Sequence, residues 1–112
     1  MRYDTDHHSV AVIGSTTAPG LHHLAYEVTD WGELKRACDH LHRHGVRLEA
    51  GPVRHGPGNN LAIYFRDIDG LRVELTCEME QILHGDHRSL TWPPTGTFNL
   101  WNGASAPSSW AE

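Results

Sequence analysis

The fold is decided by residues 61–76, which read LAIYFRDIDGLRVELT. Apolar residues alternate along 61–65 and again along 71–76, as in strands that bury one face. Between these stretches, the segment 67–70 ends in Asp69-Gly70, a dipeptide that accepts the positive φ of a tight hairpin turn. The sequence therefore predicts two antiparallel strands, with Tyr64 and Glu74 on the face opposite the aliphatic side chains.

One helix is predicted between Asp30 and Gly45. Asp30 and Glu33 have the spacing of a capping box. Gly45 stands where a left-handed C-terminal cap is expected. A core-facing stripe at i, i+3, i+4 and i+7 consists of Leu34, Ala37, Cys38 and Leu41.

Further strands precede and follow this helix. Residues 21–28 alternate, with His23 on one face, and residues 46–50 form a short strand that is ended by Gly51-Pro52. From residue 21 the order is therefore β-α-β-β-β, and a β-branched run at 9–13 predicts one extra strand in front of it. We expect an α+β fold with a curved, largely antiparallel sheet over residues 1–78.

Residues 79–112 form an irregular tail rich in Gly, Pro, Ser and Asn. Trp92, Trp101 and Trp110 punctuate this tail. Because an exposed tryptophan leaves a large apolar surface in water, we expect part of the tail to cover a surface of the domain at 1–78.

A formal net charge of -5 argues against a nucleic-acid-binding protein, because such surfaces are strongly basic. No apolar run approaches the roughly 20 residues that span a membrane, and no signal-peptide pattern opens the sequence. Cys38 and Cys77 are too few and too unpatterned for a disulfide framework, which favours the reducing cytoplasm.

His23, Tyr64 and Glu74 come from three strands and share the face opposite the aliphatic residues. Imidazole and carboxylate groups suit borderline divalent ions such as Fe(II), Mn(II) or Zn(II). Plainer interpretations stay open. Glu74 can pair with Arg72 or Arg66 as a surface ion pair, which contributes little. His23 can be an ordinary strand histidine, and Tyr64 a core aromatic.

Four segments together resemble the C-terminal half of type I extradiol catechol dioxygenases. They are HLAYEV (23–28), GPVRHG (51–56), NLAIYFRD (60–67) and GLRVEL (70–75), and the resemblance runs from about Asp6 to Cys77. These enzymes belong to the vicinal oxygen chelate superfamily, which also holds glyoxalase I and the bleomycin- and fosfomycin-resistance proteins. The resemblance implies a βαβββ module that pairs with a second module.

By position, the resemblance implies that His23 and Glu74 are two ligands of a His-His-carboxylate triad. Such a triad binds Fe(II), or alternatively Mn(II), and leaves positions open for a catechol and O2. In the family, the first histidine ligand lies in a preceding unit, of which only the last strands have a counterpart here, at residues 6–13. The chain is then a fragment, or a partner chain supplies the rest.

A symmetric homodimer is the third way to complete the site. Pairing two copies would put the partner's His23 where the missing histidine belongs. The partner's Glu74 would be a possible fourth ligand, as in the two-histidine, two-glutamate site of glyoxalase I.

The resemblance also implies three catalytic residues. His8 matches the histidine that handles protons beside the metal, a role that suits neutral imidazole. His55 and Tyr64 match residues that hydrogen-bond the catecholate oxygen. Asn60, in the same segment, is expected to contact the substrate with them. His7 should then face away from His8, and the surface histidines are expected to be His22, His40, His42, His44, His84 and His87.

The function implied is extradiol ring cleavage of a catechol-like aromatic, with a divalent metal and O2. Two alternatives remain open from the sequence. One is a metal-poor module that binds a small molecule, as antibiotic-resistance proteins do. The other is a glyoxalase-type lyase or isomerase with its metal at a dimer interface.

Overall fold

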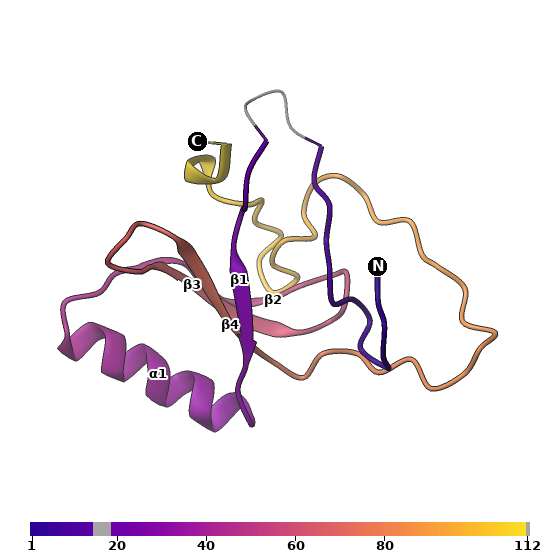
Figure 1. Ribbon diagram of the computed structural model, residues 1–112, viewed down its shortest axis with the longest axis horizontal. Helices are drawn as coiled ribbons and strands as arrows, with labels where there is room; N and C mark the ends of the chain where they lie inside the picture. The colour runs from indigo at the N-terminus through magenta and orange to yellow at the C-terminus, as the bar shows by residue number, and fades with distance from the viewer. Residues whose placement is uncertain (15–18, 112) are drawn as a thin grey trace.

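The computed structural model describes residues 1–14 and 19–111. Its elements are β1 (Leu24–Glu27), α1 (Trp31–Arg43), β2 (Leu48–Arg54), β3 (Leu61–Arg66), β4 (Arg72–Cys77) and a short 3-10 helix, η1 (Ser108–Ala111). The β-α-β-β-β order predicted from residue 21 is confirmed (Figure 1). Within this part of the chain, no helix combines the length and the apolar character needed to cross a membrane.

The four strands form one mixed sheet in the order β1-β4-β3-β2. β4 is parallel to β1 and antiparallel to β3, and β2 is antiparallel to β3. The turn between β3 and β4 is closed by Asp67, whose N–H donates to Leu71 O at 2.9 Å, and Gly70 has a φ of 82°. These contacts confirm the predicted hairpin, whose register sets Tyr64 directly opposite Glu74.

The predicted caps of α1 are also confirmed. Asp30 Oδ1 accepts from the Glu33 N–H at 2.8 Å, and Glu33 Oε2 accepts from the Thr29 N–H at 2.6 Å. Gly45 has a φ of 72°, the left-handed geometry expected after a helix. Because both ends of α1 are satisfied locally, the helix can lie on the sheet without leaving buried polar groups unpaired.

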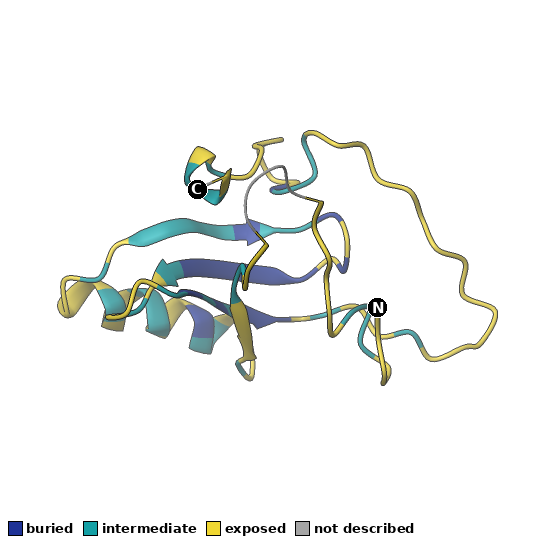
Figure 2. Ribbon diagram, turned by 45° about the horizontal axis from the view of Figure 1, so that its top comes forward, coloured by how far each residue is buried: buried dark blue, intermediate teal, exposed yellow. Residues whose placement is uncertain are grey.

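An apolar core lies between α1 and the sheet. Leu34 and Ile63 are completely buried there, beside Leu61 and Cys77. The predicted stripe on α1 is confirmed, because Ala37, Cys38 and Leu41 pack against this cluster. Figure 2 shows the buried residues mainly in β3 and β4, and α1 contributes one, Leu34.

A second apolar cluster lies on the opposite face of the sheet. Val53, Ala62 and Tyr64 are buried there, and Phe98 and Trp110 of the tail pack against them. In Figures 1 and 2 the C-terminal segment lies across the sheet from α1. The prediction that the tail covers a surface is thus confirmed, and the covered face is the one that carries Tyr64 and Glu74.

The extra strand predicted at residues 9–13 is wrong. The N–H groups of Ser9 and Val10 donate to Met1 O, and the side chain of Val12 is 82% exposed. In the described part of the chain, this N-terminal segment makes only an isolated bridge, between Asp6 and Gln81. β-branched residues favour a strand through packing against neighbours, and none of the strands in residues 1–14 and 19–111 pairs with this run.

Predicted strand boundaries also differ. The first strand is Leu24–Glu27 rather than 21–28, and β2 runs from Leu48 through Gly51-Pro52 to Arg54 rather than from 46 to 50. β2 is an edge strand, where the missing N–H of proline is tolerated. A Cβ at Gly51, where φ is 98°, would lie 2.6 Å from Ala62 O, so β2 approaches β3 too closely there for any other residue.

Candidate functional site

His23 and Glu74 meet on the face of the sheet that the tail covers. His23 stands immediately before β1, and Glu74 lies in β4 opposite Ala25. His23 Nε2 lies 2.9 Å from Glu74 Oε2, and the Glu74 side chain is only 8% exposed. The interpretation that Glu74 pairs with Arg72 or Arg66 is wrong, because both guanidinium groups donate to Glu49 instead. A buried carboxylate beside an imidazole is a donor pair for a divalent metal.

His55 and Tyr64 form the second pair of the site. His55 follows β2, and its Nδ1 lies 2.8 Å from the carbonyl oxygen of Phe98 in the tail. Because a carbonyl oxygen only accepts, His55 carries its proton on Nδ1. Its Nε2 then accepts from the Tyr64 O–H at 2.7 Å. The tail backbone thus fixes the orientation of His55, and His55 fixes the hydroxyl of Tyr64.

Burial keeps both members of this pair neutral. It lowers the pKa of His55 below its ordinary value, although the nearby Glu74 carboxylate acts in the opposite direction. It also raises the pKa of Tyr64 far above its ordinary value, with a further contribution from Glu74. Near neutral pH the pair therefore offers one phenol hydroxyl and one uncharged imidazole beside Glu74.

Replacing Tyr64 by phenylalanine should destabilise the fold by about 1–2 kcal/mol, because it leaves His55 Nε2 buried without a donor. Urea denaturation of wild type and Tyr64→Phe measures the difference. As a matched control, Tyr3→Phe removes a hydroxyl from a side chain that is 88% exposed and should leave the unfolding midpoint unchanged. Equal stability of wild type and Tyr64→Phe would contradict the role of this bond.

Asn60 lies behind the Glu74 carboxylate. Its residue surface is 2% exposed, and its Nδ2 donates to Thr76 Oγ1 at 2.7 Å and approaches Glu74 Oε1 at 3.4 Å. Its Oδ1 is buried and has no hydrogen-bond partner in the described part of the chain. Asn60 was predicted as a substrate contact, and its observed contacts orient the candidate metal ligand.

His8 approaches the same region from the N-terminal segment. A Cβ at Gly58 would lie 3.0 Å from His8 Cε1, so His8 packs directly on the glycine-rich loop. Burial and the neighbouring His7 lower the pKa of His8. The expectation that His7 and His8 face opposite ways is wrong, since both are half-buried and their Nδ1 atoms lie 3.0 Å apart. Without a strand at 9–13, no alternation separates them.

His22 is a site residue that the sequence misassigned to the surface. It is half-buried, its Nδ1 lies 2.6 Å from His23 Nδ1, and its Nε2 lies 3.0 Å from Arg72 Nη1. Burial lowers its pKa, and the charge of Arg72 lowers it further. His22 precedes β1, so strand alternation does not govern its direction. One feature of the sequence could have placed His22 near the site. Arg72 and Glu74 are two residues apart in one strand, so their side chains lie on the same face and Arg72 offers a polar partner beside Glu74.

Arg72 is itself a buried charge with a bidentate partner. Its side chain is 3% exposed, and its Nε and Nη2 donate to Glu49 Oε2 and Oε1 at 2.6 and 2.9 Å. Arg66 and Ser109 also donate to Glu49. The Arg72 hydrogen bonds hold the pKa of Glu49 down, from 4.5 to about 2.

This depressed pKa predicts an acid-dependent loss of stability. The unfolded chain takes up the Glu49 proton at a higher pH than the folded chain, so stability rises with pH in this window. The Glu49 contribution is complete above pH 4.5 and is lost as the pH falls to about 2. Urea unfolding across this range should give a shallower pH dependence for Glu49→Gln than for wild type. Identical dependences would contradict the prediction.

The described residues supply too few ligands for a complete metal site. Within residues 1–14 and 19–111, no three His, Cys, Asp or Glu side chains come together as a metal-binding group. His23 and Glu74 fit a divalent ion chemically, but two protein ligands are one short of a facial triad. A complete site needs at least one further ligand from outside these residues.

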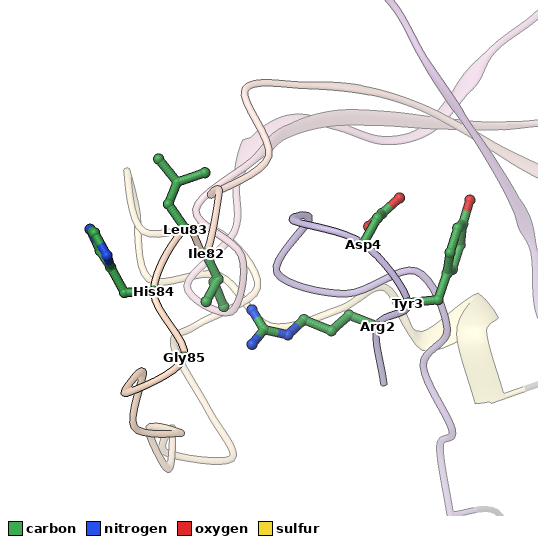
Figure 3. A pocket seen from close by; sticks show the side chains of 7 residues that line it. All are labelled: Arg2, Tyr3, Asp4, Ile82, Leu83, His84 and Gly85. Atoms are coloured by element: carbon green, nitrogen blue, oxygen red, sulfur yellow. The ribbon is translucent and has the colours of Figure 1, made fainter.

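Surface hollows among the described residues lie away from the candidate site. One, drawn in Figure 3, lies between residues 2–4 and 82–85 and includes none of the candidate site residues. Its volume is about 340 Å³. The other, of about 900 Å³, is formed by residues 45–49, 65–68 and Ser109. Glu49, Arg66 and Ser109 belong both to the second hollow and to the hydrogen bonds around Arg72.

Comparisons with known proteins point to one family. Residues 2–75 match the model of the Glyoxalase/Bleomycin resistance protein/Dioxygenase superfamily. Metapyrocatechase from Pseudomonas sp. (strain CF600) is 32% identical over 88 residues, which cover 79% of this chain and 28% of that protein. Biphenyl-2,3-diol 1,2-dioxygenase 2 from Rhodococcus globerulus is 35% identical over 81 residues, which cover 65% of this chain and 41% of that protein.

A solved structure gives the same answer for the fold. Homoprotocatechuate 2,3-dioxygenase from Brevibacterium fuscum, in complex with 3,4-dihydroxyphenylacetate, superimposes with a TM-score of 0.74 and 28% sequence identity. The match covers 83% of this chain and 30% of that one. The chain thus spans well under half of the length of each of these relatives.

Proposed function

The chain belongs to the Glyoxalase/Bleomycin resistance protein/Dioxygenase superfamily, and from this premise we propose that it is part of an extradiol-type ring-cleavage dioxygenase. The substrate is a catechol-like aromatic, and the other reactants are O2 and a divalent metal. The observation that carries the proposal is the adjacency of two pairs: His23 with Glu74, and His55 with Tyr64. The names of the similar proteins, which include dioxygenases of dihydroxylated aromatics, support the same chemistry.

His23 and Glu74 are the residues that would hold the metal. Fe(II) is the proposed ion and Mn(II) the alternative, because imidazole and carboxylate ligands suit both. When bound, such an ion supplies positions at which both catechol oxygens and O2 can be held together. Asn60, through its contacts with Glu74 and Thr76, keeps the carboxylate in place.

The remaining candidate residues act on protons and on the substrate hydroxyls. Tyr64, held by His55, offers a neutral hydroxyl that can orient a catechol oxygen. The pKa of the His8 imidazole is lowered by burial, so the ring is uncharged near neutral pH and can accept a proton. Phe98 and Trp110 cover this face with apolar surface and exclude water from the pair.

The missing ligand is proposed to come from a second module, in a homodimer or in a partner chain. β1 is the edge strand next to His23, and all four of its residues are exposed. Leu24 and Tyr26 are 41% and 56% exposed, which leaves apolar side chains and an unpaired strand edge beside the incomplete site. A module that covers this edge would bring its own side chains next to His23.

Anaerobic loading with Fe(II), followed by catechol and air, tests the proposal. We expect the absorbance of a yellow ring-fission product to appear with wild type, at a protein concentration where light scattering shows a dimer or an assembly with the partner. The matched control is Asp39→Asn, which changes an exposed carboxylate on α1, across the sheet from the C-terminal segment, and should retain the activity.

Other outcomes would overturn the dioxygenase proposal. A monomer without metal by elemental analysis, which forms no colour but still binds catechol, would instead be a small-molecule-binding module. A dimer that binds the metal and forms no colour, yet isomerises a thiohemiacetal, would be a glyoxalase-type enzyme with its site at the interface.

A further inference from the structure

Arg72 reaches the candidate metal ligand through an intermediate histidine. Its Nη1 lies 3.0 Å from His22 Nε2 and 3.3 Å from His22 O. His22 Nδ1 lies 2.6 Å from His23 Nδ1, and His23 Nε2 lies 2.9 Å from Glu74 Oε2. Arg72 is therefore linked to Glu74 in two ways: along β4, and through both histidine rings.

We call the series of contacts from Arg72 through His22 and His23 to Glu74 the relay. The chemistry of these groups gives every hydrogen bond in the relay a direction. A guanidinium group only donates, so His22 Nε2 accepts and the proton of the neutral ring lies on Nδ1. That Nδ1–H donates to His23, whose Nδ1 must then be unprotonated. The proton of His23 consequently lies on Nε2, where the Glu74 carboxylate accepts it. The direction set at Arg72 decides which nitrogen of His23 faces Glu74 with a proton.

Arg72 is held so firmly that it can act as the fixed end of this relay. Glu49 binds its guanidinium through two oxygens, and Ser109 O accepts from its Nη2 at 3.2 Å. The Trp110 ring lies against the guanidinium, with Arg72 Cζ 5.1 Å from the ring centroid. Trp110 also contacts the His22 ring, with 4.8 Å between centroids. The Arg72 guanidinium is therefore held from two sides, by Glu49 of β2 and by Ser109 and Trp110 of the tail.

We propose that Arg72 is a positioning residue for His23, which it orients through His22, and that Glu49 holds Arg72 in place. The bearing of this orientation on metal binding rests on the proposed function: an ion that binds His23 Nε2 must displace the proton held there, so Arg72 and His22 favour the His23–Glu74 contact of the metal-free chain. The orientation itself is a property of the metal-free chain. It can therefore be tested whether or not the chain cleaves catechols.

Histidine 15N NMR of the metal-free chain at about pH 8, above the ordinary histidine pKa of about 6.5, tests the proposal. Protonated and unprotonated ring nitrogens have widely separated shifts, so each tautomer is read directly. We expect His22 to be protonated on Nδ1 and His23 on Nε2 in wild type. If His22 is protonated on Nε2 instead, Arg72 cannot donate to it, and the proposal is overturned without any variant.

Arg72→Met removes the donor and should replace the single His22 tautomer by an averaged signal, with a matching change at His23. The matched control is Arg66→Met, which removes a guanidinium from the same Glu49 carboxylate without a hydrogen bond to His22. It should leave both tautomers unchanged. A folded Arg72→Met chain with wild-type His22 and His23 signals would refute the positioning role. If that variant does not fold, the wild-type tautomers still decide.

Addition of Zn(II), a diamagnetic probe, separates this proposal from the proposed function. Loss of the His23 Nε2 proton on titration with Zn(II) supports His23 as a metal ligand. If Zn(II) leaves the His23 signals unchanged, the ligand assignment fails. The tautomers of the metal-free chain and their dependence on Arg72 are decided by the earlier spectra alone.

Discussion

Replacing Glu74 by glutamine should weaken the binding of a divalent metal by more than about 100-fold. Loss of a contact behind a metal ligand costs 10–100-fold in affinity, and loss of the ligand charge itself should cost more. Glutamine keeps the size of the side chain, and its single oxygen can accept from His23 Nε2 as Glu74 Oε2 does, so only the long 3.4 Å contact between Asn60 Nδ2 and Glu74 Oε1 is lost. The fold should therefore survive while the metal affinity is lost. Titration calorimetry with Mn(II), which tolerates air better than Fe(II), measures the change.

Asp39→Asn is the control for charge alone, because it removes a carboxylate from an exposed position on α1. It should bind Mn(II) as wild type does. Equal Mn(II) affinities for wild type and Glu74→Gln would show that Glu74 is not a ligand. In that case His23 and Glu74 would be an ordinary imidazole–carboxylate contact within the sheet.

Replacing Leu34 by alanine should destabilise the chain by about 3–5 kcal/mol, the largest effect expected for a single apolar side chain. Leu34 is completely buried and is the residue of α1 that belongs to the buried cluster with Ile63 and Leu61. Its loss leaves a cavity between α1 and the sheet. Because small domains are stable by only about 5–15 kcal/mol, much of the folded population should then be lost in mild urea.

Urea denaturation followed by far-UV circular dichroism measures this loss. The control is Leu90→Ala, at a position that is 73% exposed, which should change stability by less than about 0.5 kcal/mol. If Leu34→Ala is as mild as Leu90→Ala, the cluster between α1 and the sheet does not hold the fold together.

The parts of the fold that the sequence predicted well are those set by short-range rules. The caps at Asp30 and Gly45 and the turn at Asp69-Gly70 depend on neighbouring residues alone, and all are confirmed. The run at 9–13 has strand-forming residues, but no strand of the described part of the chain pairs with it, and no local pattern reveals this. β2 passes Pro52 because it is an edge strand, and strand order is likewise a property of the whole sheet.

In the candidate site, too, local patterns predicted some residues, whereas contacts between distant parts of the chain place the others. Tyr64 in β3 and Glu74 in β4 lie on the same face of the sheet. Alternation along each strand predicted this, and the register confirms it. His22 was misassigned because the residues that bury it against the sheet are distant in sequence, with Arg72 fifty positions away and Trp110 farther still. The contacts of Trp110 depend on how an irregular tail returns to the sheet. Pattern rules for helices and strands do not predict that path.

The hydrogen bond between His55 and the Phe98 carbonyl has a consequence for the minimal functional length of the chain. The sheet and α1 are complete at Cys77, so a version cut after that residue should keep its apolar core. It would nevertheless lose the acceptor that orients His55, and with it the fixed hydroxyl of Tyr64. Folding and chemistry thus require different lengths of chain. The irregular tail adds little regular structure, yet it determines whether the folded sheet holds His55 and Tyr64 in the orientation that the site needs.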